Sequence, residues 1–395
     1  MLFFYASILI YSIASSPTPD YAGAAEFAVA VCILTAVGLI RSWNAVARSD
    51  LPSFLSLHRF FLLYMTTLPL ITALLAANPT PDILRDIIPL TFMALPLCLY
   101  GKKLPHLNSI VMIGGAGFAL RYIAPFVWGD YNNDSLLYLA NSPLVPFACI
   151  TGFHYFTSSG HNSLAIRLCG LAICAVCFMA MAAMLQRAPV ALCLAGCLLL
   201  TVLRFPSRPI MISALILIIA IITLQFLPLF IDIALSLSEK TISVGWNNRF
   251  EEWQAVLHYS TFWGHGWGAS WQSPAVADIW VRYTHNMVTY YWLKAGIIGA
   301  MMAFAFIYVW GRQIILYLWQ NPALGIAVAV PFIIHVTLYT GFKTLDFAVI
   351  LTLLTVRDAS QSKIHSDYQS CVSADHGGNR THCMRSGPLS SEKRI

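Results

Sequence analysis

Three side chains in one polar stretch of an otherwise apolar chain are suited to acid–base and anion chemistry. Arg249 carries a guanidinium, which can grip two phosphate oxygens at once. Glu252 follows one helical turn later, where the two side chains would share a helix face. His285, beside Asn286, carries an imidazole that titrates near neutral pH and can act as a general base. We therefore expect any chemistry to occur within residues 246–299.

Each of these residues also has a simpler structural interpretation. Arg249 and Glu252 could form a surface ion pair of little energetic value. Asn286 could cap the following helix, and His285 would then be only a polar residue at the helix end. Arg187, pinned between two apolar runs, is either an interfacial anchor or a functional cation, since an unpartnered arginine is costly to desolvate. Taken alone, Arg187 favours the anchor.

The composition indicates a polytopic membrane protein. Of the 395 residues, 58% are hydrophobic and only 10% are charged, whereas soluble domains usually carry about 25% charged residues. The net charge of +6 fits attraction to anionic lipid headgroups, because there is no long basic run of the kind that binds nucleic acid. The expected fold class is all-α, with membrane lipids as the solvent for most of the surface.

Apolar runs that could form membrane helices occur along most of the chain. A helix needs about 20 apolar residues to cross a bilayer, and fewer where the membrane thins locally. About twelve spans are expected on this basis. The candidate spans are residues 2–14, 24–40, 59–77, 87–100, 107–124, 143–157, 164–185, 188–203, 209–231, 287–310, 323–341 and 344–356.

The distribution of lysine and arginine among the loops predicts the orientation, because cytoplasmic loops carry an excess of these residues. One set of loops holds eight such cations: Arg41, Arg48, Lys102, Lys103, Arg167, Arg204, Arg208 and Arg312. The opposite loops hold most of the acids. We therefore expect both termini to be cytoplasmic and the long loop 232–286 to be periplasmic. Residues 357–395 are polar and aperiodic, as in a disordered tail.

These boundaries divide the chain into N-terminal transmembrane helices (1–186), a transmembrane domain with the periplasmic loop (187–356) and the tail (357–395). Within the loop, residues 247–259 predict a short amphipathic helix with Phe250, Trp253 and Leu257 on one face. A turn-rich glycine run follows. The aromatic residues form either a headgroup-level belt, which is favoured for most of them, or a platform for sugar rings: Trp246, Trp253, Trp263, Trp267, Trp271, Trp280, Tyr283, Tyr290, Tyr291 and Trp292.

The remaining histidines and cysteines predict no cofactor or metal site. His154, His161 and His335 lack polar neighbours and are interpreted as structural. Cys174 and Cys177 have the spacing of a redox or zinc pair, but they lie among apolar residues without a nearby carboxylate. They are interpreted as small buried hydrophobes.

In combination, these motifs resemble the O-antigen ligase and polymerase family. The resemblance rests on Arg249-x-x-Glu252-Trp253, the glycine run 264–268, His285-Asn286, and the Gly-Ile-Ile-Gly sequence at 296–299. Arg187 is similar to the arginine of a Ser-Arg-Gly element in that family, although glutamine and alanine flank it here. The resemblance covers roughly residues 185–310.

The resemblance implies a bacterial inner-membrane glycosyltransferase of type C architecture, facing the periplasm. Such enzymes move a glycan from undecaprenyl pyrophosphate to a lipid A core sugar, a growing glycan or a protein hydroxyl, with no metal or cofactor. It implies that Arg187 and Arg249 contact the pyrophosphate and that His285 activates the acceptor hydroxyl. We expect three further residues to line the substrate site: Glu252, Arg282 and Asn286.

Other functions fit the same composition. Within the family, the motifs do not separate an O-antigen ligase from a polymerase or a protein O-oligosaccharyltransferase. A polysaccharide transporter or flippase would place polar groups near the bilayer midplane and contain internal repeats. A binding or scaffold protein would need no catalytic base. Because the polar groups gather in one outer loop and at helix ends, the sequence favours the enzyme.

Overall fold

The computed structural model describes residues 2–14, 51–127, 141–158, 163–184, 187–204, 247–274, 279–339, 342 and 344–356. The predicted spans 24–40 and 209–231, most of the predicted loop before residue 247 and the tail 357–395 lie outside these ranges. The described part of the chain is mostly helical, as expected for an all-α membrane protein. Its strands are confined to one short hairpin, β1 (Trp271–Ser273) and β2 (Ile279–Val281).

Four of the described helices are long and apolar enough to cross a membrane. These are α4 (Ser53–Leu75), α7 (Leu107–Val127, apolar over Leu107–Ala124), α9 (Leu164–Ala183) and α14 (Met287–Gln320). Shorter apolar helices accompany them, namely α1 (Leu2–Ala14), α8 (Leu144–Thr157), α10 (Arg187–Arg204) and α15 (Pro322–Thr337). The predicted terminal span 344–356 contains α16 (Leu345–Leu353).

The predicted span 87–100 is interrupted in the structure. Helix α5 (Thr80–Phe92) ends there, and a single turn, α6 (Leu95–Cys98), follows. Pro89 lies inside α5 and Pro96 inside α6. Helix α5 continues past Pro89, whereas Pro96 lies in the first turn of α6, where proline is tolerated. In a continuous helix the ring of Pro96 would clash with the carbonyl of Phe92, so the break falls between Phe92 and Leu95.

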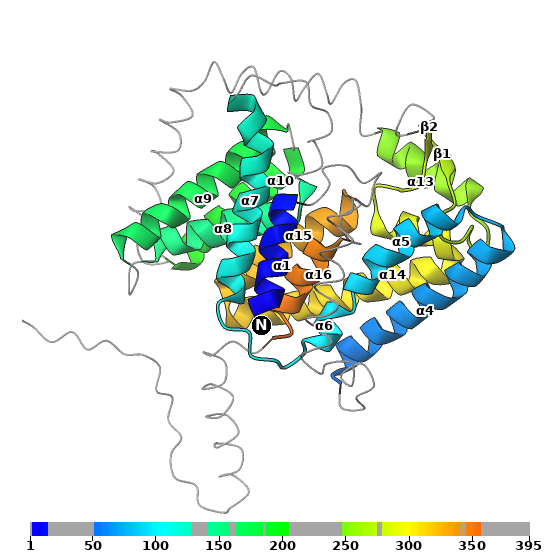
Figure 1. Ribbon diagram of the computed structural model, residues 1–395, viewed down its shortest axis with the longest axis horizontal. Coiled ribbons are helices and arrows are strands. Elements are labelled where there is room, and N and C mark those ends of the chain that lie inside the picture. Colours follow the sequence, from blue (N-terminus) through cyan, green and yellow to red (C-terminus); the bar gives the residue numbers. More distant parts are fainter. Residues whose placement is uncertain are drawn as a thin grey trace, which may run out of the picture.

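The helices form two groups joined by α14 and α15. Figure 1 shows α4, α5 and α13 (Asn247–Tyr259) on one side, α7 to α10 on the other, and α1, α15 and α16 between them. Helices α8 and α9 approach closely at Gly152 and Gly170, where a side chain would come within 2.6 Å of a backbone oxygen. Close contact through small residues is how helices associate when lipid removes the hydrophobic drive between them.

Helix α14 is broken at Gly296, and the break organises the site side of the molecule. Gly296 has φ 69° and ψ −163°, a conformation that only glycine adopts readily. A side chain at this position would also lie 2.0 Å from the carbonyl oxygen of Phe262. The break frees backbone groups of α14 that a continuous helix would bond internally.

The glycine loop, residues 262–268, bonds these freed groups. Three backbone hydrogen bonds join the loop to the break: His265 N–H to Leu293 O (2.9 Å), Gly266 N–H to Lys294 O (2.9 Å) and Ile297 N–H to Phe262 O (3.1 Å). The hydroxyl of Tyr64, from α4, donates to Ala295 O (3.2 Å). Within a membrane protein such groups must find internal partners, because lipid offers none.

The same loop also donates hydrogen bonds to backbone carbonyls of α4, a helix whose hydrogen bonding is interrupted by a proline. Pro69 lies inside α4 and has no N–H, so the carbonyl of Met65 lacks its helical donor. The indole Nε1–H of Trp267 donates to Met65 O (2.9 Å), and the backbone N–H of Trp267 donates to Pro69 O (3.2 Å). Asn78 fixes the loop from the other side through its amide, which donates to the carbonyls of His265 and Trp267 (2.9 and 2.8 Å).

The glycine loop therefore predicts a large difference between two glycine-to-alanine substitutions. Gly266 has φ 78°, and an added Cβ would lie 2.3 Å from the backbone nitrogen of Ala73. Gly266→Ala should lower the free energy of unfolding by about 2 kcal/mol or more, since strained backbone alone costs on the order of 1–3 kcal/mol. Thermal unfolding of the purified protein in detergent measures this loss.

Gly311 provides the matched control, because it lies in α14 with no atom within 4 Å of an added Cβ. Gly311→Ala should leave stability unchanged or raise it by up to about 1 kcal/mol. Equal melting temperatures for the two variants would show that the loop is not anchored as described.

Candidate functional site

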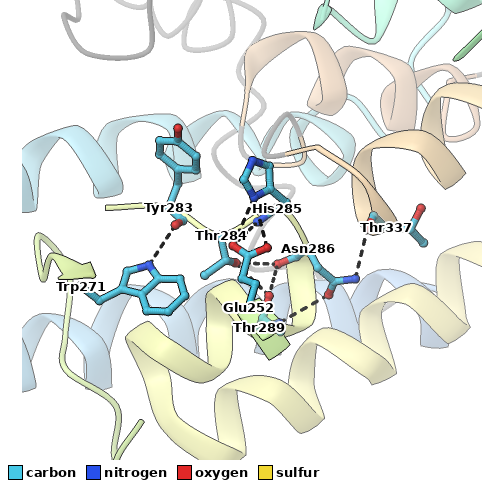
Figure 2. A network of polar contacts seen from close by, with 8 residues as sticks. All are labelled: Glu252, Trp271, Tyr283, Thr284, His285, Asn286, Thr289 and Thr337. Atoms are coloured by element: carbon cyan, nitrogen blue, oxygen red, sulfur yellow. Dashed lines mark hydrogen bonds and ion pairs between the residues drawn. The ribbon is translucent and has the colours of Figure 1, made fainter. Parts of the chain in front are cut away.

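A buried carboxylate and an imidazole form the centre of the candidate site. Glu252 lies on α13 and is only 2% exposed, while His285 immediately precedes α14 and is 21% exposed. His285 Nδ1 lies 3.1 Å from Oε2 and 3.2 Å from Oε1 of Glu252. The backbone N–H of His285 also donates to Glu252 Oε1 (3.2 Å). Figure 2 shows the imidazole standing above the carboxylate.

The carboxylate determines which ring nitrogen carries the proton. An ionised glutamate only accepts hydrogen bonds, so Nδ1 of His285 must be the donor. In the neutral imidazole, Nε2 then has no proton and is free to accept one. Among the described residues, no protein group is hydrogen-bonded to Nε2. The pair thus presents an oriented base, following the same logic as a histidine held by a carboxylate in a catalytic triad.

Three tertiary contacts hold α13 so that Glu252 faces His285. Val256, one turn after Glu252, is fully buried in a small cluster with Trp271, Val281 and Leu293. This cluster joins α13 to the hairpin and to α14. Because the hairpin ends at Val281 and α14 begins at Met287, the short segment that carries His285 is fixed at both ends.

Polar contacts shape the segment between β2 and α14. Thr289 Oγ1 donates to Thr284 Oγ1 (2.9 Å), and Trp271 Nε1–H donates to the carbonyl of Tyr283 (3.0 Å). The Tyr283 ring meets the His285 ring edge-on, with centroids 5.6 Å apart. These contacts leave the imidazole little freedom to rotate away from Glu252.

Asn286 caps helix α14, as the simpler interpretation proposed. Its Oδ1 accepts from the backbone N–H groups of Val288 (2.8 Å) and Thr289 (3.4 Å). Its amide nitrogen reaches across to the carbonyl of Thr337 on α15 (3.4 Å), as Figure 2 shows. A substrate-binding role for Asn286 stays a prediction, and it would use a side chain already engaged in structure.

Of the three arginines predicted to bind substrate, the structure describes the side chain of Arg282. Arg282 pairs with Asp82 of α5, with Nε 3.0 Å from Oδ1. Arg187 begins α10, and Arg249 lies in the first turn of α13, one turn before Glu252. The side chains of Arg187 and Arg249 lie outside the described part of the structure, so their contacts with a pyrophosphate remain predictions.

Helix α13 has the predicted bounds, but the predicted apolar face is not the buried one. Phe250 is 66% exposed and Leu257 47% exposed, while Glu252 and Val256 are buried. The amphipathic pattern identified this face without specifying which way it points. The buried Glu252–His285 pair turns the helix the other way, which presents its apolar face to the surroundings.

The favoured aromatic belt is wrong for several of the residues assigned to it. Trp267, Trp271, Tyr290 and Tyr291 are at most 1% exposed and belong to the core. Their rings pack around the glycine loop and the break in α14, so they serve the fold. Trp263 and Trp280, at 54% and 63% exposed, remain available at the surface, whereas Trp246 lies outside the described residues.

A second buried ion pair lies beside the end of the glycine loop. It was not predicted from the sequence. Lys294 Nζ is 3.0 Å from Asp86 Oδ2, and the two side chains are 0% and 2% exposed. Lys294 also donates to the carbonyl of Ala269 (2.6 Å), and Asp86 accepts from Gly268 N–H and the Tyr290 hydroxyl (both 2.9 Å). A lysine inside an apolar span is the signal that could have identified this pair.

The structure describes two of the three histidines that were interpreted as structural. His335 is 1% exposed and packs against Tyr339 and Phe347. His154 contacts Arg204 (3.4 Å). His161 lies outside the described residues. In the described ranges, no three histidine, cysteine or acidic side chains are grouped so that they could hold a metal ion.

The Asp86–Lys294 pair predicts a strong coupling between two substitutions. Lys294→Met leaves a buried carboxylate uncompensated, which typically costs about 3–5 kcal/mol. Asp86→Asn combined with Lys294→Met removes both charges and should recover a large part of this loss, as a double-mutant cycle detects. Lys103→Met, at an exposed position, is the control and should be neutral. Additive losses in the double variant would contradict the pairing.

Comparison with protein families and curated proteins identifies no relative of this chain. No protein-family model matches the chain. No curated protein matches it either.

Proposed function

We propose that the protein is a membrane glycosyltransferase that moves a glycan from undecaprenyl pyrophosphate to an acceptor hydroxyl at the periplasmic face. The observation that carries the proposal is the buried Glu252 carboxylate on Nδ1 of His285, which leaves Nε2 as an oriented proton acceptor. The motif resemblance gives the substrate class, and the geometry of the pair is compatible with the base that such a transfer requires.

The reaction needs two kinds of group. The acceptor hydroxyl must lose its proton as it attacks the anomeric carbon, and His285 Nε2 can take that proton. The lipid pyrophosphate leaves with the electron pair of the glycosidic bond, and nearby cations stabilise the charge that develops on it. No nucleotide is consumed, because the pyrophosphate is already the activated leaving group.

Arg249 is the first choice for the cation nearest the base. It precedes Glu252 by three residues on α13, and residues at this spacing lie on neighbouring positions of one helix face. A donor pyrophosphate held by Arg249 would thus lie on the same helix that positions His285. Arg187 and Arg282 are the further candidates, and Arg282 would share its charge with Asp82.

The proposed location is the bacterial inner membrane, with both termini in the cytoplasm. Four described helices are compatible with multiple crossings. The Glu252–His285 pair lies where the chain returns into the long apolar helix α14, at a membrane boundary on this reading. The lysine and arginine bias among the loops would place that boundary on the periplasmic side.

A polymerase or protein O-oligosaccharyltransferase would use the same donor and the same base. Analysis of surface glycans in a strain lacking the protein separates them. Loss of all attached glycan with accumulation of lipid-linked polymer indicates a ligase, and survival of one attached repeat unit indicates a polymerase. Loss of surface glycan together with lipid-linked donor stalled on the cytoplasmic face would instead indicate a flippase.

His285 should be required for transfer but not for folding or donor binding. Loss of a general base typically lowers the rate by a factor of about 10²–10⁴, so His285→Ala should insert in the membrane and bind lipid-linked donor yet transfer almost none. The measurement is glycan transfer with purified protein and donor. His258→Ala, at an exposed position of α13, is the matched control and should keep wild-type transfer.

The orienting role of Glu252 can be tested in the same assay. Glu252→Gln should lower transfer by itself, because the amide no longer fixes the tautomer of His285. In a protein that already carries His285→Ala, the same change should have no further effect. Wild-type transfer by His285→Ala would reject the base, and independent losses would reject the pair.

Glycan transfer should be impaired even when Arg249 is replaced by lysine, which keeps the positive charge. A lysine ammonium cannot reproduce the paired contacts that a guanidinium makes with two phosphate oxygens. Arg249→Lys should therefore raise the donor KM or lower the rate by at least about tenfold, the equivalent of one charge-assisted hydrogen bond. Near-normal transfer by Arg249→Ala, at unchanged expression, would remove Arg249 from the donor site.

A further inference from the structure

Two adjoining cavities lie at the end of the bundle opposite the Glu252–His285 pair. Their volumes are about 170 Å³ and about 110 Å³. Both are lined by Asn108, Tyr155 and Leu324. Helix α14 begins beside His285 and runs 34 residues to Gln320, next to Asn321, which lines the smaller cavity. The cavities are therefore separate from the site already described.

The smaller cavity contains a buried polar group without a partner. Thr151, on α8, is 7% exposed, and its hydroxyl has no hydrogen-bond partner among the described residues. Buried threonines elsewhere in the bundle donate to the carbonyl one turn earlier, as Thr352 does to Ala348 O (2.7 Å). A buried hydroxyl left unpaired costs about 1–3 kcal/mol, so the Thr151 hydroxyl points to a bound group.

The first turns of two helices also line these cavities. Leu107, Asn108 and Ser109 begin α7 and line the larger cavity, while Ala323 and Leu324 begin α15 and line the smaller one. The N-terminus of a helix carries a partial positive charge and favours anions. Two such ends at one cavity favour a negatively charged ligand over a cation.

The charges around the cavities agree with an anion. No aspartate or glutamate is among the lining residues, and His154 lines the smaller cavity. The guanidinium of Arg204 contacts His154 Nδ1 (3.4 Å) and donates to Ser158 Oγ (3.0 Å). The positive charge of Arg204 is therefore separated from the cavity by the side chain of His154, which lines the same cavity as Thr151.

We infer that these joined cavities bind a phosphate group. The smaller cavity, which Thr151 lines, has a volume of about 110 Å³, and the adjoining one has a volume of about 170 Å³. Both are larger than a single bound water requires, and either has room for a phosphate group. The Thr151 hydroxyl donates to it, the two helix ends face it, and Arg204 supplies charge. The phosphate belongs either to an anionic lipid headgroup or to a small soluble molecule. Exposed leucines of α10 beside Arg204, among them Leu199 and Leu203, favour the lipid.

The test measures binding of two probes to the purified full chain in a neutral detergent. The first probe is inorganic phosphate, followed by the rise in melting temperature. The second is phosphatidylglycerol in mixed micelles, followed as retained lipid by native mass spectrometry, with phosphatidylcholine as the zwitterionic reference. Binding of phosphatidylglycerol alone identifies a lipid headgroup, and a response to inorganic phosphate identifies a soluble phosphate compound.

Thr151→Val removes only the hydroxyl and keeps the shape of the side chain. Because that hydroxyl has no protein partner, the unliganded variant should be as stable as the wild type or more stable, while affinity for the responding probe falls by about tenfold or more. Thr201→Val is the matched control, since it changes a buried threonine of α10 that lines neither cavity and that donates to Cys197 O (2.9 Å). It should leave probe affinity unchanged.

Two further variants keep the inference falsifiable if Thr151→Val does not fold. Thr151→Ser keeps the hydroxyl and should keep binding, whereas Arg204→Gln should weaken binding and flatten its dependence on salt. Failure of the wild type to bind either probe would overturn the phosphate site. Equal affinities in the wild type, Thr151→Val and Arg204→Gln would overturn it as well.

Discussion

The backbone break at Gly296 is the constraint on which this half of the molecule depends. A span interrupted along its length exposes carbonyl and amide groups, and a lipid environment supplies no partner for them. The glycine loop provides these partners through His265, Gly266 and Phe262. The loop can approach so closely only because its glycines, and Gly296 itself, have no side chains in the way. The break and the loop thus require each other.

The Asp86–Lys294 pair also holds the glycine loop in place against α14. Its two charges are bonded to groups of the loop, namely Gly268 N–H and Ala269 O. A buried ion pair adds little net stability, because desolvation offsets most of the attraction. Its contribution here is positional, since the charges fit only when α5, α14 and the loop are assembled together. A transporter would expose such charges to its path, but here they are fully enclosed and bonded.

The sequence was informative where the pattern is local. The bounds of α13, most apolar helices and the capping by Asn286 could be read from composition and spacing, since each depends on neighbours in the chain. The buried face of α13 could not, because it depends on His285, which lies 33 residues away along the chain. The Asp86–Lys294 pair was missed for the same reason. In the sequence, Asp86 is one of several acidic residues of the outer loops, and its partner Lys294 lies far away along the chain.

These contacts together explain how the imidazole of His285 is held in position at the start of α14. The glycine loop fixes the first part of α14, and the hairpin that follows the loop fixes the segment before it. Val256 of helix α13 packs against the hairpin and α14. This packing places Glu252 in contact with both the ring and the backbone of His285. Two contacts from one carboxylate restrain position and tautomer together. In the proposed transfer, the acceptor hydroxyl would approach His285 from the Nε2 side, the side of the ring that Figure 2 shows turned away from Glu252.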